Sequence, residues 1–155
     1  MMVEPFYRGE LVRNPRFDDW HNGRPVYWEG AVGVPITPAH TGYRMLRLGG
    51  NAWGPSEIYQ DLTVNPGTFL ELRFCGRVAV FGSVLQVSIT WLNREERAVG
   101  SGLELVMALA HDTEYRHCVA VSNACPASVV QARVSFRIPS GGGQFDLDYV
   151  SVVAR

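Results

Sequence analysis

The stretch EIYQDLTVNPGTFLELRF, residues 57–74, constrains the fold more than any other part of the sequence. Its first half places three apolar residues and one glutamine on alternate positions: Ile58, Gln60, Leu62 and Val64. Its second half alternates in the same way, and period-two alternation is typical of strands that bury one face. The segment Asn65-Pro66-Gly67 between them is a turn, because proline presets φ and glycine adopts positive φ without steric cost. We therefore predict two strands joined as a β-hairpin, with Gln60 as a buried amide that backbone groups satisfy.

The rest of the chain repeats this pattern of short alternating runs between turn residues. Its 16 glycines and 9 prolines are spread along the sequence rather than clustered. The most regular run is 85–91, where Gln86, Ser88 and Thr90 alternate with apolar residues. Only the run Leu103–Ala110 is too short for periodicity to separate a strand from a helical turn. We predict a single all-β domain over residues 1–155, with about ten strands in two antiparallel sheets and no helix.

Composition excludes several functional classes. The net charge is −1, so nothing in the overall charge demands nucleic acid or an anionic membrane. The first residues lack a basic region followed by an apolar one, so no signal peptide is expected. This leaves a cytoplasmic protein or a module of a longer secreted chain. Cys75, Cys118 and Cys125 are an odd number and favour free buried thiols, with a disulfide between the last two left open.

Catalytic motifs are missing from the sequence. None of the four histidines belongs to an HExxH motif, and no GxSxG nucleophile elbow occurs. Two carboxylate pairs, Asp18/Asp19 and Asp146/Asp148, have the residue type that a glycosidase needs. Such pairs in loops or at strand ends more often form turns, cap backbone groups or bind a cation. We therefore expect a protein without catalytic residues.

Several fragments, in order along the chain, resemble one family. They are the opening Asn14–Asp18, Trp28, Leu46–Leu48, Tyr59–Val64 with the following Pro66-Gly67, Ala124–Ala127 and the closing Leu147–Val152. Together they resemble the galactose-binding-domain-like jelly-roll modules, in particular carbohydrate-binding modules of families four and nine. They are also similar to small modules at the start of Firmicute repeat proteins. The resemblance implies a jelly-roll β-sandwich.

The resemblance also implies a structural Ca²⁺ between the opening and closing motifs. Asp18 and Asp148 are the matching carboxylates, and carbonyl groups near Thr41–Gly42 are expected to complete the oxygen ligands. Tyr149 stands where the family has a second aspartate. The alternative is that Asp18 caps a turn and that Asp148 pairs with an arginine.

Glycan binding is the second implication, since such modules grip sugars with aromatic faces and polar groups. Counting strands places alternate loops at one end of the sandwich. The residues expected there are Trp20, His21, Asn51, Trp53, Asp112 and Tyr115. Trp28 and Trp91 have inward parity and are predicted in the core. Two alternatives remain open: Trp20 and Trp53 fold over the barrel end as caps, or the polar face with Gln86, Ser88 and Thr90 floors a groove.

The function that follows is a non-catalytic carbohydrate-binding module, with no nucleic acid or membrane partner. The competing class is a structural or protein-interaction domain that keeps the fold without a sugar site, and a homo-oligomer is left open. Four arginines point outward in the alternating runs: Arg73, Arg77, Arg133 and Arg137. A sandwich has two outer faces, and the sequence does not say whether these arginines share one.

Overall fold

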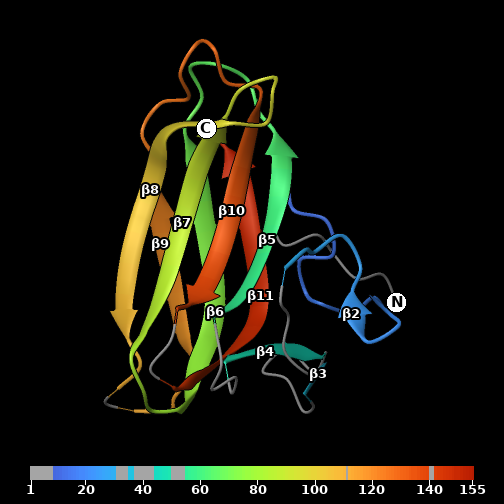
Figure 1. The fold of residues 1–155 in the computed structure, drawn as a ribbon, viewed down its shortest axis with the longest axis vertical. Coiled ribbons are helices and arrows are strands. Elements are labelled where there is room, and N and C mark those ends of the chain that lie inside the picture. Colours follow the sequence, from blue (N-terminus) through green and yellow to red (C-terminus); the bar gives the residue numbers. More distant parts are fainter. Residues whose placement is uncertain (1–8, 31–34, 37–43, 50–54, 111, 140–141) are drawn as a thin grey trace.

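The computed structural model describes residues 9–30, 35–36, 44–49, 55–110, 112–139 and 142–155. These residues form a β-sandwich of two antiparallel sheets and a small hairpin (Figure 1). The four-stranded sheet has the order β5 (Ser56–Thr63), β10 (Gln131–Ile138), β7 (Val84–Leu92) and β8 (Ala98–Ala108). The five-stranded sheet has the order β3 (Pro35–Ile36), β4 (Met45–Gly49), β11 (Gln144–Ala154), β6 (Leu70–Val80) and β9 (Arg116–Val121). The all-β prediction is confirmed, and the ambiguous run at Leu103 belongs to a strand.

The hairpin prediction for residues 57–74 is wrong in one respect. Both strands form, and Gly67 has the expected positive φ of 85°. However, β5 pairs with β10, whereas β6 pairs with β11 and β9, so the chain crosses from one sheet to the other between them. Period two reports which face of a strand is buried, but not which strand lies beside it. The connection of residues 64–69 is also longer than a tight two-residue hairpin loop.

The core lies between the two sheets and contains the residues that alternation assigned to it. Trp28 and Trp91 are 3% and 1% exposed, as predicted. The rings of Phe74 on β6 and Phe136 on β10 meet edge to face across the core, 5.2 Å apart. Burial of each such side chain contributes roughly 1.5–3 kcal/mol. The buried indole N–H groups are satisfied, since Trp28 donates to the Asn14 carbonyl at 3.1 Å and Trp91 to the Asn123 side chain at 3.0 Å.

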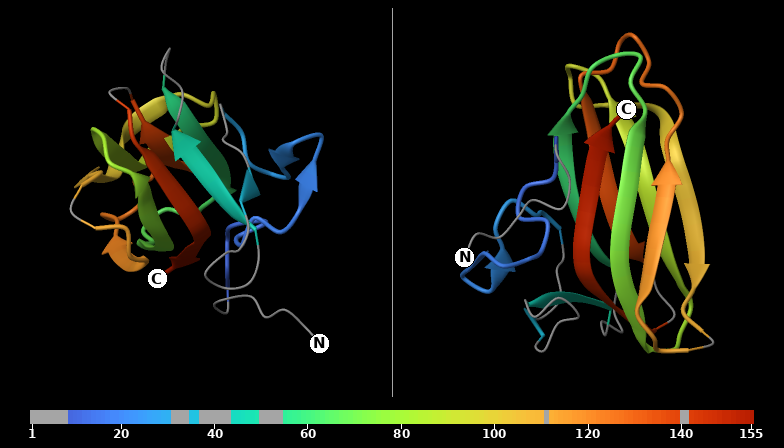
Figure 2. Two further views of the ribbon diagram at one scale, coloured as in Figure 1. Left: turned by 90° about the horizontal axis from the view of Figure 1, so that it is seen from below. Right: turned by 180° about the vertical axis from the view of Figure 1, so that it is seen from behind.

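The segment of residues 9–30 closes one flank of the sandwich, between β5 and β11 (Figures 1 and 2). Its strands are β1 (Trp20–His21) and β2 (Arg24–Pro25), which pair with each other as a short hairpin. It bridges Glu10 to Val153 of β11 and Glu29 to Tyr59 of β5. It therefore touches both sheets and covers the edge strand β5 of the four-stranded sheet.

Gln60 fixes this segment to β5, and its prediction is confirmed. Gln60 is only 5% exposed. The amide oxygen accepts from the Arg13 backbone N–H at 2.8 Å, and the amide nitrogen donates to the Arg13 carbonyl at 3.0 Å. A side-chain amide thus replaces a strand partner, which explains a glutamine at an apolar position.

The remaining sequence questions have direct answers. Arg73 and Arg77 lie on β6 of the five-stranded sheet, whereas Arg133 and Arg137 lie on β10 of the four-stranded sheet, so the four arginines do not share a face. All three cysteines are free, and burial raises the pKa of each thiol. Within the described residues, no helix is long and apolar enough to cross a membrane.

Candidate functional site

The outer surface of the four-stranded sheet carries polar side chains from three neighbouring strands, and we call it the polar face. Alternation turns the core residues of β5, β10 and β7 inward and their neighbours outward. The outward residues are Glu57, Tyr59 and Asp61 on β5, Arg133, Ser135 and Arg137 on β10, and Gln86, Ser88 and Thr90 on β7. The alternative prediction of a polar surface on β7 therefore names part of this face.

The guanidinium of Arg133 lies on the polar face, and we call it the arginine ridge. Arg133 lies opposite Asp61 in the strand register and binds its carboxylate with two hydrogen bonds of 2.8 and 3.0 Å. Its guanidinium also lies 4.2 Å from the centre of the Tyr59 ring. The bond to Asp61 raises the pKa of Arg133. Two partners fix this guanidinium, so its remaining N–H groups are oriented before any ligand arrives.

A hollow of about 650 Å³ lies where residues 10–29 meet β5, and we call it the edge hollow. Tyr59, Asp61 and Gln131 line it from the sheet. Arg13, Tyr27 and Glu29 line it from the segment that closes the flank. Such a volume lies in the range of small-molecule sites. The reciprocal bonds of Gln60 to Arg13 hold the two walls together.

Tyr27 is the most exposed aromatic residue of this hollow. Its residue is 56% exposed, and the Arg13 guanidinium lies 5.3 Å from its ring centre. Its φ of 72° is rare for a bulky residue. The Asn14 amide holds this conformation by donating to the carbonyls of Asp19 and Val26, both at 2.9 Å. The fold thus maintains an unusual backbone conformation that leaves an aromatic ring in solvent.

A second, smaller hollow of about 250 Å³ lies further across the polar face, and we call it the central hollow. Its polar lining comes from all four strands: Glu57, Gln86, Ser88, Glu104, Ser135 and Arg137. The Ser135 hydroxyl donates to the Glu57 carboxylate at 2.9 Å. No ion pair joins Arg137 to another described residue, so its guanidinium is available to a ligand.

Together the two hollows offer donors, acceptors and an aromatic ring along one surface. A sugar hydroxyl both donates and accepts, and it therefore suits a surface that mixes carboxylates, amides and guanidinium groups. The ring of Tyr27 adds an apolar surface beside them.

The loop cluster predicted from the sequence is divided by the structure. Trp20 and His21 lie in the small β1–β2 hairpin on the flank, while Asp112 and Tyr115 lie between β8 and β9 at one end of the sandwich (Figure 1). Asn51 and Trp53 lie outside the described residues. Strand counting failed because β1 and β2 form a separate hairpin and belong to neither main sheet.

The side chains of this cluster are also engaged differently from one another. Trp20 packs partly against the core and donates to the Phe17 carbonyl at 2.6 Å. His21 is exposed. The Tyr115 hydroxyl contacts the Met45 sulfur at 3.1 Å, and the Arg77 guanidinium covers its ring at 5.2 Å. Asp112 pairs with Arg116.

The calcium prediction stays a prediction, because part of the expected site lies outside the described residues. The opening motif does reach the closing strand, since the Val150 N–H donates to the Pro15 carbonyl at 2.9 Å. Asp148 is fully buried on β11, whereas Asp18 is exposed. Among the described residues, no group of three His, Cys, Asp or Glu side chains could hold a metal ion. A cation there would depend on carbonyl groups, and Thr41–Gly42 lie outside the described residues.

Pairing with arginines is observed at Asp146, two residues before Asp148 on β11. Its fully buried carboxylate accepts from Arg47 at 2.8 and 3.1 Å and from Arg77 at 3.2 Å. This ion-pair cluster joins β4, β11 and β6 on the outer face of the five-stranded sheet.

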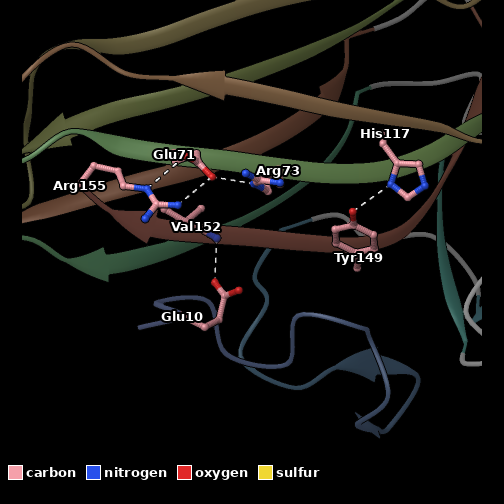
Figure 3. A network of polar contacts seen from close by, with 7 residues as sticks. All are labelled: Glu10, Glu71, Arg73, His117, Tyr149, Val152 and Arg155. Atoms are coloured by element: carbon pink, nitrogen blue, oxygen red, sulfur yellow. Dashed lines mark hydrogen bonds and ion pairs between the residues drawn. The ribbon is translucent and has the colours of Figure 1, made fainter. Parts of the chain in front are cut away.

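The same outer face holds a cysteine and a histidine that sequence motifs did not single out. His117 lies between the Tyr149 hydroxyl, 3.0 Å from Nδ1, and the Cys75 sulfur, 3.8 Å from Nε2. Figure 3 shows His117 of β9 and Tyr149 of β11 pointing toward one another over β6, the strand between them. Burial, with the nearby Asp148 carboxylate, raises the pKa of Cys75 to about 12. At neutral pH this thiol is protonated and is not an activated nucleophile.

Sequence reasoning missed Tyr27 and Tyr59, although a signal for both exists. Tyr59 alternates with Ile58 and Gln60, and Tyr27 precedes the inward Trp28, so parity places both rings outside. The contribution of residues 9–30 to the edge hollow had no such signal, because it depends on where that segment docks.

Comparisons with known proteins support the fold. No protein-family model and no curated protein sequence matches the chain. Among solved structures, tailspike protein 4 of bacteriophage CBA120, in its enzymatically active domain, matches 95% of the chain with a TM-score of 0.74 and 14% identity. The chain spans 22% of that tailspike chain.

Two smaller structures match over almost their whole length. TmCBM61 in complex with β-1,4-galactotriose has a TM-score of 0.60 and 15% identity, covering 94% of this chain and 99% of that one. The CBM22-2 xylan-binding domain of Paenibacillus barcinonensis Xyn10C has a TM-score of 0.62 and 12% identity, covering 91% and 98%. At these identities the likeness establishes the fold. The chain has the jelly-roll fold of these carbohydrate-binding modules.

Proposed function

We propose that the protein is a non-catalytic carbohydrate-binding module that holds an oligosaccharide or polysaccharide against the polar face. The observation that carries this proposal is the edge hollow, where the exposed ring of Tyr27 stands beside Arg13, Glu29, Asp61 and Gln131. A ligand chain that runs from there toward the central hollow would meet the fixed guanidinium of Arg133.

The balance of charges favours a neutral glycan. The two hollows and the ridge between them contain three guanidinium groups, of Arg13, Arg133 and Arg137. The carboxylates that line the same surface are those of Glu10, Glu29, Glu57, Asp61 and Glu104. Because carboxylates outnumber guanidinium groups, an acidic polysaccharide would be repelled. Two of the structures with this fold are named as bound to galactotriose and as xylan-binding, which makes β-1,4-galactan and xylan suitable first probes.

Binding is tested by affinity gel electrophoresis on soluble polysaccharides and by calorimetry with oligosaccharides. For the glycan that binds, we expect Tyr27→Ala to weaken binding at least about tenfold, which corresponds to about 1.4 kcal/mol for one lost stacking ring. The matched control is Phe69→Ala, which removes another exposed aromatic ring, 44% exposed, from a different place on the sandwich. Binding to no glycan, or equal effects of the two variants, would overturn the proposal.

The loop residues of the sequence prediction provide a second comparison. Trp53→Ala tests the loop that the structure does not describe. If Trp53→Ala abolishes binding while Tyr27→Ala leaves it unchanged, then the glycan is bound through Trp53 and not through the edge hollow.

A further inference from the structure

The two flanks of the sandwich differ. Residues 9–30 cover the flank at β5, whereas β8 forms the opposite edge of the four-stranded sheet (Figure 1). The first half of β8 is irregular, with two register shifts against β7 and with Gly100 and Gly102. Asn123 also binds this half, through the carbonyls of Ser101 and Gly102. Its second half, Leu103–Ala108, is regular, and we call it the β8 edge.

The β8 edge has the properties of a pairing site. It contains no proline or lysine and only one charged residue, Glu104. In the described part of the chain, no hydrogen bond reaches it from any element other than β7. Proteins usually protect such an edge with charges, bulges or a covering segment, because its free N–H and C=O groups accept another strand.

The side chains of the β8 edge are also incompletely covered. On its inner side, Leu103, Leu105 and Met107 pack against the core but remain partly exposed. On its outer side, Val106 is 68% exposed, the highest value among the exposed large apolar residues. An added strand would bury apolar surface on both sides of the sheet.

We propose that the β8 edge pairs antiparallel with the β8 edge of a second copy of this chain, with Leu105 on the two-fold axis. In this register Leu105 lies opposite its own copy and Leu103 lies opposite Met107, so the inner apolar row continues across the axis. Glu104 lies opposite Val106, and both belong to the outer face. Residues that face each other thus share a side of the sheet, as pairing requires.

Self-complementarity identifies a second copy as the occupant. A two-fold interface brings the same patch together twice, so a charged patch would repel itself. Here the one carboxylate of each edge faces a valine and not its own copy. No register shift of one residue is tolerated, because it would turn Glu104 toward the apolar row.

The dimer would join the two polar faces into one surface of eight strands. Glu104, Leu105 and Val106 line the central hollow, so the central hollows of the two copies would lie close to the axis. A ligand chain that reaches both hollows would be bound by two modules, which increases its apparent affinity. A six-residue strand pair is a small interface, so we expect a dimer that forms at high micromolar concentrations.

Sedimentation velocity from about 10 µM to 1 mM tests the dimer, and three variants test its register. Val106→Glu places a new carboxylate opposite Glu104 of the other copy, once on each side of Leu105. We expect at least a tenfold rise in the dimer Kd. Val106→Lys places an ammonium opposite Glu104, and we expect dimerisation to be kept or strengthened. The double variant Glu104→Lys/Val106→Glu restores opposite charges and is expected to restore the dimer.

Val119→Glu is the matched control, because Val119 is an exposed valine, 57% exposed, on the edge strand β9 of the other sheet. We expect no effect from it, and unfolding midpoints close to wild type for all variants. A wild-type chain that stays monomeric at 1 mM overturns the proposal. Loss of the dimer in Val119→Glu, or equal behaviour of Val106→Glu and Val106→Lys, overturns it too. Since these measurements use no glycan, they fail or succeed independently of carbohydrate binding.

Discussion

Replacement of Gln60 by leucine is the sharpest test of how residues 9–30 are attached to the sandwich. The amide of Gln60 makes two hydrogen bonds to the backbone of Arg13, and its residue is almost fully buried. Leucine keeps the apolar volume but removes both bonds. The N–H and C=O of Arg13 then lose their partners in a partly buried place, while the wall of the edge hollow that carries Tyr27 is released.

The magnitude follows from the two bonds. Each contributes about 1 kcal/mol, and each backbone group left without a partner adds up to about 1 kcal/mol more when it is partly reached by water. We therefore expect Gln60→Leu to lower the free energy of unfolding by about 2–4 kcal/mol. For a domain of this size, 1 kcal/mol shifts Tm by about 2–4 °C, so the expected decrease is roughly 5–15 °C.

Calorimetry and urea unfolding measure this change, with Gln86→Leu as the control. Gln86 is an outward glutamine at mid-strand on β7, so its replacement is expected to change stability by less than about 0.5 kcal/mol. If Gln60→Leu is no less stable than Gln86→Leu, then the reciprocal bonds do not hold the segment. The edge hollow would then lack the fixed wall on which glycan binding depends.

Three further predictions concern stability. Burial raises the pKa of Glu10 above 4.5, although its carboxylate accepts hydrogen bonds from the Val152 and Val12 N–H groups. The stabilising contribution of Glu10 is therefore present below pH 4.5 and is lost as pH rises through the raised pKa. Melting curves between about pH 4 and 7 should therefore show the Tm of Glu10→Gln rising relative to that of wild type as pH rises. A relative Tm that rises as pH falls would contradict this. Asn123→Ala removes the acceptor of the buried Trp91 N–H and should lower the free energy of unfolding by about 1–3 kcal/mol. Denaturant titrations measure this change, and an unchanged free energy of unfolding would contradict the prediction. If a cation joins the opening and closing motifs, excess EDTA should lower Tm and added Ca²⁺ should restore it. An unchanged Tm would rule out the cation site.

Alternation predicted the core well, for a physical reason. Period two depends only on which side of each strand is buried, and Gln60 on β5 and Trp91 on β7 are placed by that rule alone. Strand pairing depends on contacts between residues far apart in sequence. The turn at Gly67 has the expected backbone conformation, yet it connects strands of different sheets.

The candidate site was less accessible to sequence reasoning than the core. Tyr59 and Gln86 could be assigned to the outside of their strands, but not to one shared surface, because β5 and β7 are neighbours only through β10. The edge hollow also needs residues 9–30, whose position depends on hydrogen bonds such as those of Gln60. We predicted Trp20 as a ligand contact because it is aromatic and was expected in a loop, but it is partly buried and packs against the core.

Figure 3 places Glu10 at the junction between this segment and β11, with its carboxylate on the Val152 N–H, 2.7 Å away. On the neighbouring strands, Glu71 binds both Arg73 and Arg155 and ties the end of the chain to β6. The hydrogen bond of Glu10 and the ion pairs of Glu71 stabilise the fold. The ion pairs of Glu71 lie on the five-stranded sheet, away from the polar face, whereas Glu10 also lines the edge hollow.

The most direct test of glycan binding by the polar face is a titration followed by ¹H–¹⁵N NMR, with an oligosaccharide of the glycan that binds. We expect saturable shifts at Tyr27, Tyr59, Asp61, Gln131 and Ser88, with none at Arg73 and Val119 on the other sheet. Shifts confined to the five-stranded sheet, or to Asp112 and Tyr115 between β8 and β9, would contradict the assignment of the site.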